Sequence, residues 1–396
     1  MQEQKAILIF GVGDLQLSII RRAKQRGLFT VGIDPMPNAY AKDEVNAFEV
    51  VGGQDYEGTI AVAKRFNVKA VVTAATDKPL VMMARVALEL HLPFYTVETA
   101  QWSTDKFQMK QRFIEGGVPC AHGRLAKSIN EISDLQLPLI VKPRDNSGSR
   151  GVILCRNQQE LEEAFKEAMS YSHLDSVLVE EFIEGQEYSI ESLHYNGKTE
   201  VIQFTEKTTT PFPYNVELAH KQPANLTEEQ KNAVREVICK IALCMKFENC
   251  PSHTELKINE RGVFVIETSP RLGGGNITSH LVPLSTGINM EDQLLSIALG
   301  ENINTETGRI NKASGVKFLE LKEGKVQRIY PEISEVINWP NMVDFHYDLK
   351  EGSEVHSFKS GLDRYGQFII QTESRMELDS LMKEYNLKIE KYFLIE

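Results

Sequence analysis

The sequence lacks the features that mark several common classes of protein. Its five cysteines form no CxxC pair and are odd in number, which argues against a disulfide framework or a zinc cluster. No apolar run approaches the ~18 residues of a membrane-spanning helix. The polar N-terminus with the short run Ala6–Phe10 also lacks the apolar core of a signal peptide. We therefore expect reduced thiols, no membrane partner and a cytoplasmic location.

The chain also has fewer basic residues than acidic ones. The 396 residues include 44 Lys and Arg against 55 Asp and Glu, a formal net charge of -11. Nonspecific binding to nucleic acid needs a basic surface, so no nucleic-acid partner is expected. The hydrophobic fraction of 42% and the charged fraction of 25% are ordinary for a globular protein. The length suggests two or three domains at roughly 150 residues each.

The first hundred residues alternate short apolar runs with helical patterns. Such alternation predicts parallel βαβ units, and hence an open α/β sheet. The expected strands are Ala6–Phe10, Phe29–Ile33, Ala47–Val51 and Ala70–Thr73, and the expected helices are Leu15–Arg26, Thr59–Phe66 and Pro79–Leu90. A break follows around His91–Thr104, so residues 1–103 are predicted to form the first domain.

The rest of the chain has the pattern of an α+β structure. We expect antiparallel strand pairs at Leu139–Lys142 with Val152–Cys155 and at Ser252–Ile258 with Gly262–Thr268, and helices at Asp105–Glu115, Gln158–Met169 and Thr227–Met245. Thr227 and Gln230 have the spacing of a capping box, which predicts that the last of these helices begins there. Residues 313–396 are predicted to form hairpins and a helix at Ser374–Tyr385.

A glycine turn after the first strand suggests a dinucleotide site. Gly11 and Gly13 begin the GxGxxG pattern, and Asp34 ends the second strand, where an acid can bind a ribose. Position 16, however, is Gln16 where the third glycine belongs. An NAD-dependent oxidoreductase is therefore kept only as an alternative, beside the simpler interpretation that the glycines permit a tight turn.

Lys142 precedes a polar turn that could hold phosphate. The turn contains Ser147, Gly148 and Ser149, whose backbone N–H groups and hydroxyls could donate to phosphate oxygens while Lys142 supplies positive charge. The turn is no Walker loop, since GxxxxGK[ST] is absent. The alternative is that these residues are only the tip of a hairpin.

The segment Glu180–Glu187 ends a predicted strand with acids around an apolar pair. Adenine needs an apolar slot and backbone hydrogen-bonding groups, which Glu180, Glu181, Phe182 and Ile183 could offer. A ribose needs a carboxylate, which Glu187 could offer. The alternative is a solvated acidic strand end.

Two acids lie within apolar strands, where an uncompensated carboxylate is costly. Glu255 and Glu267 fall on the two strands predicted to pair, and two carboxylates suit Mg²⁺, which keeps phosphate and water ligands. The hydroxyl of Ser269 could add a weaker ligand. The alternative is that each acid pairs with a basic side chain such as Lys257 or Arg271.

Arg271 is followed by a run of three glycines at 273–275. A guanidinium just beyond the second candidate metal ligand could bind a γ-phosphate, a carboxylate or an acyl phosphate. The glycines would let backbone N–H groups approach an anion closely. An acid four residues before an arginine that leads into GGG is a more specific pattern than a glycine turn alone.

With these motifs in this order, the chain resembles the ATP-grasp superfamily. Members include biotin carboxylase, the carbamoyl-phosphate synthase large chain and D-alanine–D-alanine ligase. The segments His253–Leu256 and Glu267–Gly275 look most like the L-amino-acid ligase branch. The resemblance implies an α/β pre-ATP-grasp domain over residues 1–103 and an ATP-grasp domain of two α+β subdomains over 104–310. It also implies a lid subdomain at about 115–185 and a small C-terminal closing lobe over 311–396.

The resemblance also implies roles for particular residues. Lys106 and Lys142 match the two nucleotide-contacting lysines, and Ser147–Gly151 matches the lid over the triphosphate. Glu180–Ile183 match the adenine hinge, and Glu187 the ribose acid. Glu255 and Glu267 match the metal ligands, Ser269 stands where many members have Asn as a third ligand, and Arg271 matches the arginine that stabilises the transferring phosphoryl group.

The function so implied is that of an ADP-forming carboxylate–amine ligase. ATP with Mg²⁺, or Mn²⁺ in its place, would activate a small-molecule carboxylate as an acyl phosphate, which an amine then attacks. Ammonia, thiol or bicarbonate could replace the amine, and a non-catalytic ATP-binding module is a further alternative. The resemblance also admits a homodimer, because dimers are common among the relatives.

Three further residues stay open at this stage. His253 fits a substrate-orienting or metal-supporting role and a satisfied core histidine equally well. Lys207 is expected in a solvated loop, with a position beside the acceptor substrate as the alternative. Asp77 fits a substrate contact as well as a helix N-cap.

Overall fold

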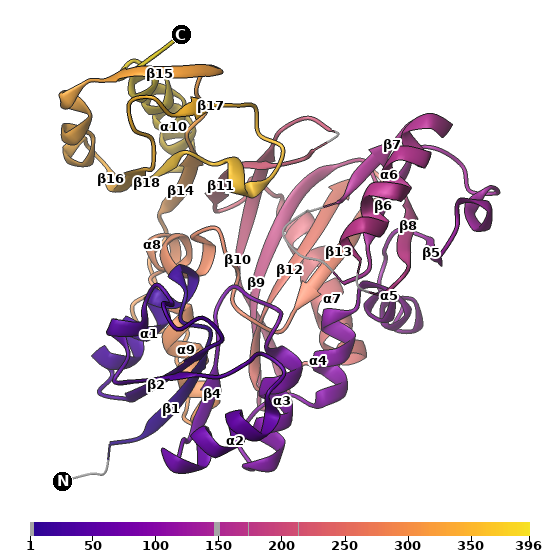
Figure 1. Ribbon diagram of the computed structural model, residues 1–396, viewed down its shortest axis with the longest axis vertical. Coiled ribbons are helices and arrows are strands. Elements are labelled where there is room, and N and C mark those ends of the chain that lie inside the picture. The colour runs from indigo at the N-terminus through magenta and orange to yellow at the C-terminus, as the bar shows by residue number, and fades with distance from the viewer. Residues whose placement is uncertain (1–3, 146–150, 173, 213) are drawn as a thin grey trace.

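The computed structural model describes residues 4–145, 151–172, 174–212 and 214–396. Figure 1 shows three regions: an N-terminal one at the lower left, a small sheet with its helix at the right, and a C-terminal one at the top. A long central sheet runs between them. Mixed α/β regions in this order confirm the predicted fold class.

The N-terminal region is a parallel sheet of four strands in the order β3-β2-β1-β4. Its strands are β1 (Ala6–Phe10), β2 (Phe29–Asp34), β3 (Ala47–Val50) and β4 (Ala70–Val72), and its helices are α1 (Leu17–Gln25), α2 (Tyr56–Arg65) and α3 (Leu80–Glu89). β1, β2 and β4 are short, apolar and largely buried, as parallel strands covered by helices must be, whereas the edge strand β3 is only partly buried. The predicted βαβ pattern is thus confirmed.

One helix in this region differs from the sequence-based expectation. The predicted break at His91–Thr104 contains α4 (Val97–Thr104), which Thr96 caps by accepting the N–H of Thr99. The residues that α4 buries are Thr99, Ala100 and Ser103. Because these are small or polar, the helix shows no apolar stripe, which is the signal that helix prediction relies on.

A small antiparallel sheet follows, in the order β5-β8-β6-β7. Its strands are β5 (Gly123–Ala126), β6 (Leu139–Pro143), β7 (Ile153–Cys155) and β8 (Val177–Glu181), and α6 (Gln158–Tyr171) packs on one face. α5 (Lys106–Glu115) precedes it. The predicted hairpin of β6 and β7 is confirmed by its register, in which Leu139 pairs with Cys155.

The large sheet is antiparallel and has eight strands in the order β13-β12-β9-β10-β11-β14-β18-β16. They are β9 (Gln186–Tyr195), β10 (Lys198–Thr209), β11 (Glu217–Gln222), β12 (Cys250–Asn259), β13 (Gly262–Ser269), β14 (Ala313–Phe318), β16 (Met342–Tyr347) and β18 (Gly366–Thr372). α7 (Glu228–Met245) begins at the predicted capping box of Thr227 and Gln230. α8 (Val282–Thr286) and α9 (Met290–Ala298) follow β13.

At both predicted domain boundaries, elements from the two sides pack against each other. The C-terminal strands β14, β18 and β16 extend the central sheet, since β11 pairs with β14. The C-terminal region nevertheless has its own core and a separate three-stranded sheet of β15 (Gly324–Ile329), β17 (Glu354–Val355) and β19 (Phe393–Ile395), beside α10 (Arg375–Glu390). α9 packs against α1 and β4 of the N-terminal region. In the described part of the chain, no helix is long and apolar enough to span a membrane.

Candidate active site

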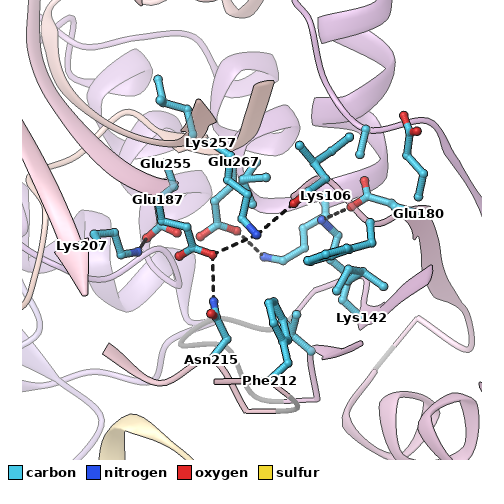
Figure 2. A pocket seen from close by; sticks show the side chains of 18 of the residues that line it. Lys106, Lys142, Glu180, Glu187, Lys207, Phe212, Asn215, Glu255, Lys257 and Glu267 are labelled. Carbon is cyan, nitrogen blue, oxygen red and sulfur yellow. Dashed lines mark hydrogen bonds and ion pairs between the residues drawn. The ribbon is translucent and has the colours of Figure 1, made fainter. Parts of the chain in front are cut away.

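A cavity lies between the small sheet and the large sheet, and Figure 2 shows the side chains around it. Lys142, Glu180 and Val152 line it from the small sheet, and Glu255 and Glu267 line it from the large one. Lys106, the first residue of α5, reaches it from outside both sheets. Four of the predicted site residues that are far apart in sequence therefore meet here: Lys106, Lys142, Glu255 and Glu267.

One end of the cavity is apolar and aromatic. Phe182 and Ile183 follow β8, and the ring of Phe182 meets that of Phe212 edge to face, with centroids 5.2 Å apart. The Nζ of Lys257 lies 4.9 Å from the Phe182 ring centre and donates to the carbonyl of Ile183 at 3.1 Å. Phe182 and Ile183 thus lie at an apolar part of the cavity wall that the ammonium group of Lys257 also reaches, and their binding of adenine stays a prediction. Phe212, on the β10–β11 connection, was not predicted.

The acids of the same segment differ in their contacts. Glu181 accepts the backbone N–H of His122 at 2.9 Å, so its side chain faces β5. Glu187 accepts from the side-chain amide of Asn215 at 2.9 Å and lies 3.4 Å from the Nζ of Lys257 (Figure 2). Glu187 is therefore held at the cavity wall by an amide donor and a nearby ammonium group and is no solvated strand end.

Glu180 is buried between two lysines. Its carboxylate oxygens lie 2.5 Å from the Nζ of Lys142 and 2.7 Å from the Nζ of Lys110. Burial raises the pKa of a carboxyl, but the two ammonium groups outweigh it and lower the pKa of Glu180. Lys110 was not predicted, although it stands one helical turn after Lys106, a spacing that places both on one face of α5.

The two predicted metal ligands are direct cross-strand partners. Glu255 of β12 pairs with Glu267 of β13, which places both side chains on the same face of the sheet. Lys106 lies 3.1 Å from Glu267, and Lys207 lies 3.1 Å from Glu255. The acids do pair with lysines, but with these two and not with Lys257 or Arg271.

Burial and neighbouring charges determine how these groups titrate. Burial alone would lower the pKa of Lys106, but the carboxylate of Glu267 raises it above its ordinary value. Burial would likewise raise the pKa of Glu255, but Lys207 and then His253 lower it. Lys106 and Glu255 are consequently both charged at neutral pH, as an electrostatic site requires.

The prediction that Lys207 lies in a solvated loop is wrong. Lys207 is in β10, its side chain is 4% exposed, and its Nζ bridges Glu217 at 2.9 Å and Glu255. The segment around Lys207 is polar and therefore suggested a loop. The acids that neutralise Lys207 lie on other strands, so the local sequence did not reveal them. Glu217, on β11, was not predicted as a site residue; it also accepts from Arg364 at 2.9 Å.

His253 is buried beside Glu255. Its Nδ1 lies 2.6 Å from Glu191, and its Nε2 lies 3.4 Å from Glu255. Burial lowers the pKa of a histidine, but the carboxylate of Glu191 outweighs it and raises the pKa of His253 to about 9. His253 is therefore charged and has partners for both ring nitrogens, as a satisfied core histidine would. It also contacts a candidate metal ligand, so a metal-supporting role stays open as well.

A second cavity adjoins the first and shares Lys106 and Glu267 with it. Arg271 and Asp77 meet here, with Nε and Nη2 of the guanidinium 2.9 and 3.0 Å from the two oxygens of Asp77. Ser269 donates its hydroxyl to the same carboxylate at 2.6 Å. An acid of the N-terminal region thus orients two predicted site residues.

The glycines after Arg271 make room for side chains. A Cβ on Gly273 would lie 2.6 Å from Nδ1 of His253, and a Cβ on Gly275 would lie 2.6 Å from the ring of His220. Gly275 also has a φ of 58°, which glycine adopts without strain. Two of the three glycines are thus required by histidines that pack beside them.

The N-terminal glycine turn is filled by its own side chains. Gln16 is buried, accepts the N–H of Gly13 at 3.1 Å and donates to the carbonyl of Ala74 at 2.7 Å. Asp34 accepts the N–H groups of Val12 and Met36, both at 2.9 Å. The N–H groups of Val12 and Gly13 and the carboxylate of Asp34 are therefore already hydrogen-bonded within the protein and are not available to a dinucleotide.

The donor set at the cavity fits Mg²⁺. Glu255 and Glu267 line the first cavity, whereas Ser269 lines the second, where its hydroxyl oxygen keeps lone pairs while its proton bonds to Asp77. Two carboxylates suffice where phosphate and water supply the remaining ligands. Within the described ranges, no group of three or more His, Cys, Asp or Glu could hold a metal by itself. The predicted lid residues Ser147, Gly148 and Ser149 lie outside the described residues.

Comparisons with known proteins agree with this architecture. Residues 135–280 match the ATP-grasp domain family. The chain is 26% identical to the protein y4rH of Sinorhizobium fredii, covering 81% of this chain and 68% of that protein. It is also 26% identical to the alanine–anticapsin ligase of Bacillus amyloliquefaciens, covering 61% of this chain and only 56% of that ligase.

Solved structures are similar over the whole chain. The L-amino acid ligase from Bacillus licheniformis superposes with a TM-score of 0.84 at 21% identity, covering 100% of this chain and 99% of that one. The phosphoribosylglycinamide synthetase from Anaerococcus prevotii superposes with a TM-score of 0.77 at 22% identity, covering both chains fully. At such identities the likeness establishes the fold. The chain therefore contains an ATP-grasp domain and has the ATP-grasp fold.

Proposed function

We propose that this protein is an ATP- and Mg²⁺-dependent carboxylate–amine ligase. It phosphorylates a small-molecule carboxylate to an acyl phosphate and joins it to an amine of an amino-acid or peptide-like substrate, with release of ADP and phosphate. The observation that carries the proposal is the meeting of Lys106 and Lys142 with the cross-strand pair Glu255 and Glu267 at one cavity.

The residues of the first cavity have complementary roles in nucleotide binding. The slot formed by Phe182, Ile183 and Phe212 takes the adenine, and Glu187 at the wall takes the ribose hydroxyls. Lys142 and Lys106 stand along the remaining wall, where their charges meet phosphate oxygens. Glu255 and Glu267 would hold Mg²⁺, which would supply positive charge against the phosphates.

The second cavity serves the carboxylate and the amine. Arg271 lies at this cavity with two of its N–H groups directed to Asp77, which leaves further donors for an oxyanion. The shared wall of Lys106 and Glu267 brings the carboxylate beside the terminal phosphate. Catalysis is then a matter of positioning and charge stabilisation.

The names of the similar proteins support an amine as the nucleophile. Alanine–anticapsin ligases and D-alanine–D-alanine ligases are among the relatives in sequence, and an L-amino acid ligase is among those in structure. Ammonia-, thiol- or bicarbonate-accepting chemistry stays an alternative, since carbamoyl-phosphate synthase is another relative. A cytoplasmic location and a homodimer stay predictions from the sequence.

An amino-acid panel tests the proposal. The protein is mixed with Mg-ATP and single or paired amino acids, and ADP, phosphate and product mass are measured. We expect phosphate release that depends on an amino acid, with a product heavier than either substrate by condensation. Bicarbonate, ammonium and a thiol run in parallel would reveal the other nucleophiles. Binding of ATP without phosphate release under any condition would indicate a binding module, and a response to NADH would indicate an oxidoreductase.

A further inference from the structure

Three charged side chains meet behind the first cavity. Lys110, Glu180 and Lys142 come from α5, β8 and β6, and their side chains are 3%, 5% and 7% exposed. One carboxylate oxygen of Glu180 faces Lys110 at 2.7 Å and the other faces Lys142 at 2.5 Å. The carboxylate is therefore shared between two ammonium groups in a place that water hardly reaches.

The charges of this trio do not cancel. Two ammonium groups and one carboxylate leave one unit of positive charge, and a buried unbalanced charge is unfavourable unless a counter-ion approaches. Burial, the largest influence, together with the positive charge of Lys110 lowers the pKa of Lys142 despite the nearby Glu180. Lys106 stands close enough to contribute in the same direction. The trio thus favours an anion at its open end.

The open end of the trio faces the cavity. Lys142 and Glu180 line the cavity, whereas Lys110 is absent from the described residues that line it. Lys110 therefore reaches Glu180 from the side away from a bound ligand and acts only through it. With Glu180 balanced by Lys110, the trio presents a net positive charge to a ligand; with Lys110 absent, Glu180 would cancel the charge of Lys142.

We propose that Lys110 is a positioning residue of the nucleotide site, which neutralises Glu180 so that Lys142 presents an uncompensated positive charge to a polyphosphate. This inference rests on the proposed function, since it assigns the ligand of Lys142 to the nucleotide. The competing interpretation is that the Lys110–Glu180 ion pair only fastens α5 to β8.

Variants that change the net charge of the trio separate the two interpretations. Lys110→Met keeps the length of the side chain and brings the net charge to zero, so the affinity for Mg-ADP should fall at least tenfold. The double variant Lys110→Met with Glu180→Gln restores a net charge of one, so its affinity should return to within about threefold of the unchanged protein. The matched control is Lys240→Met, at an exposed position on α7, which should leave the affinity unchanged.

The affinity is measured by titration of the full chain with Mg-ADP, and circular dichroism reports folding. A purely structural ion pair predicts that the double variant binds as weakly as Lys110→Met or more weakly, and that result would overturn the inference. The double variant buries no unbalanced carboxylate and can be measured even if Lys110→Met does not fold. In that case an affinity for Mg-ADP within about threefold of the unchanged protein supports the inference, and a loss of tenfold or more refutes it. Should the double variant not fold either, the ion pair is structural and the inference is wrong.

The same measurements distinguish an error in the role of Lys110 from an error in the proposed function. If the unchanged protein does not bind Mg-ADP at all, the nucleotide site itself is wrongly assigned. If it binds Mg-ADP and releases phosphate with an amino acid, but the double variant is not restored, only the role of Lys110 is refuted.

Discussion

Glu291 offers a test of how burial controls the junction between the N-terminal region and α9. It lies in the first turn of α9, is 4% exposed, and accepts from the hydroxyl of Ser18 on α1 at 2.9 Å. Burial is the largest influence on this carboxyl and raises its pKa from 4.5 to about 7, although Ser18 and Arg22 oppose the change. The folded protein thus holds the proton of Glu291 up to near neutral pH.

The raised pKa has a definite sign for stability. Between pH 4.5 and about 7 the folded state binds more protons at Glu291 than the unfolded state, so its contribution to stability falls as the pH rises. Below pH 4.5 both states are protonated and nothing is lost. Above pH 7 the full penalty is present, on the order of 3 kcal/mol at about 1.4 kcal/mol per pKa unit.

Glu291→Gln removes the ionisable group and keeps its shape and the acceptor for Ser18. At pH 8.5 the variant should be more stable than the unchanged protein by up to about 3 kcal/mol, or several degrees in the thermal midpoint. At pH 4.5 the two proteins should differ by less than about 0.5 kcal/mol. Thermal unfolding at both pH values measures this, and hydrogen exchange of the α9 amides locates the effect.

The matched control is Glu236→Gln, which removes a carboxylate at an exposed position on α7. A Glu291→Gln variant that is equally or less stable at pH 8.5 would refute the reasoning. It would mean that Glu291 is ionised in the folded protein, supported by Arg22 and the N-terminus of α9 more strongly than burial opposes it.

Two predictions concern the proposed reaction. Glu267→Gln removes one of two facing carboxylates, so turnover of ATP should fall at least a hundredfold while circular dichroism is unchanged; near-normal turnover would remove the metal assignment. Asp77→Asn removes the carboxylate that accepts from Nε and Nη2 of Arg271, so kcat should fall about tenfold while the affinity for Mg-ADP changes less than twofold. Steady-state kinetics and nucleotide titration check this, and an unchanged kcat would mean that Arg271 is oriented without Asp77.

Much of the local structure could be predicted from the sequence because short-range physics determines it. The capping box of Thr227 and Gln230 begins α7 as predicted, since a cap depends on residues three apart. The strands bearing Glu255 and Glu267 are joined by the short turn at 259–262, and the tight turn sets the register as far as Leu256 and Val265. A register shift between Glu255 and Leu256 then places Glu255 opposite Glu267, which the turn alone does not determine. α4 escaped prediction because its buried residues are small and polar.

The partners of the charged residues could be decided only by the tertiary structure. Lys207 stands in a polar run that suggested a solvated loop, yet the sheet places it between Glu217 and Glu255. Lys110 was not predicted and the role of Asp77 was left open, because the groups they bind come from segments far along the chain. A charge is buried only where a distant partner meets it, and no local pattern contains that partner.

The sequence by itself thus determined the order of strands and helices and the type of chemistry that its acids, lysines and arginine can perform. The tertiary structure decided which of these groups share a cavity, which are neutralised behind it, and which strands continue the central sheet. The physical reason is the range of the interactions. Periodicity, capping and tight turns act over a few residues, whereas burial and charge pairing depend on packing between distant elements, such as those that carry Asp77 and Arg271, 194 positions apart.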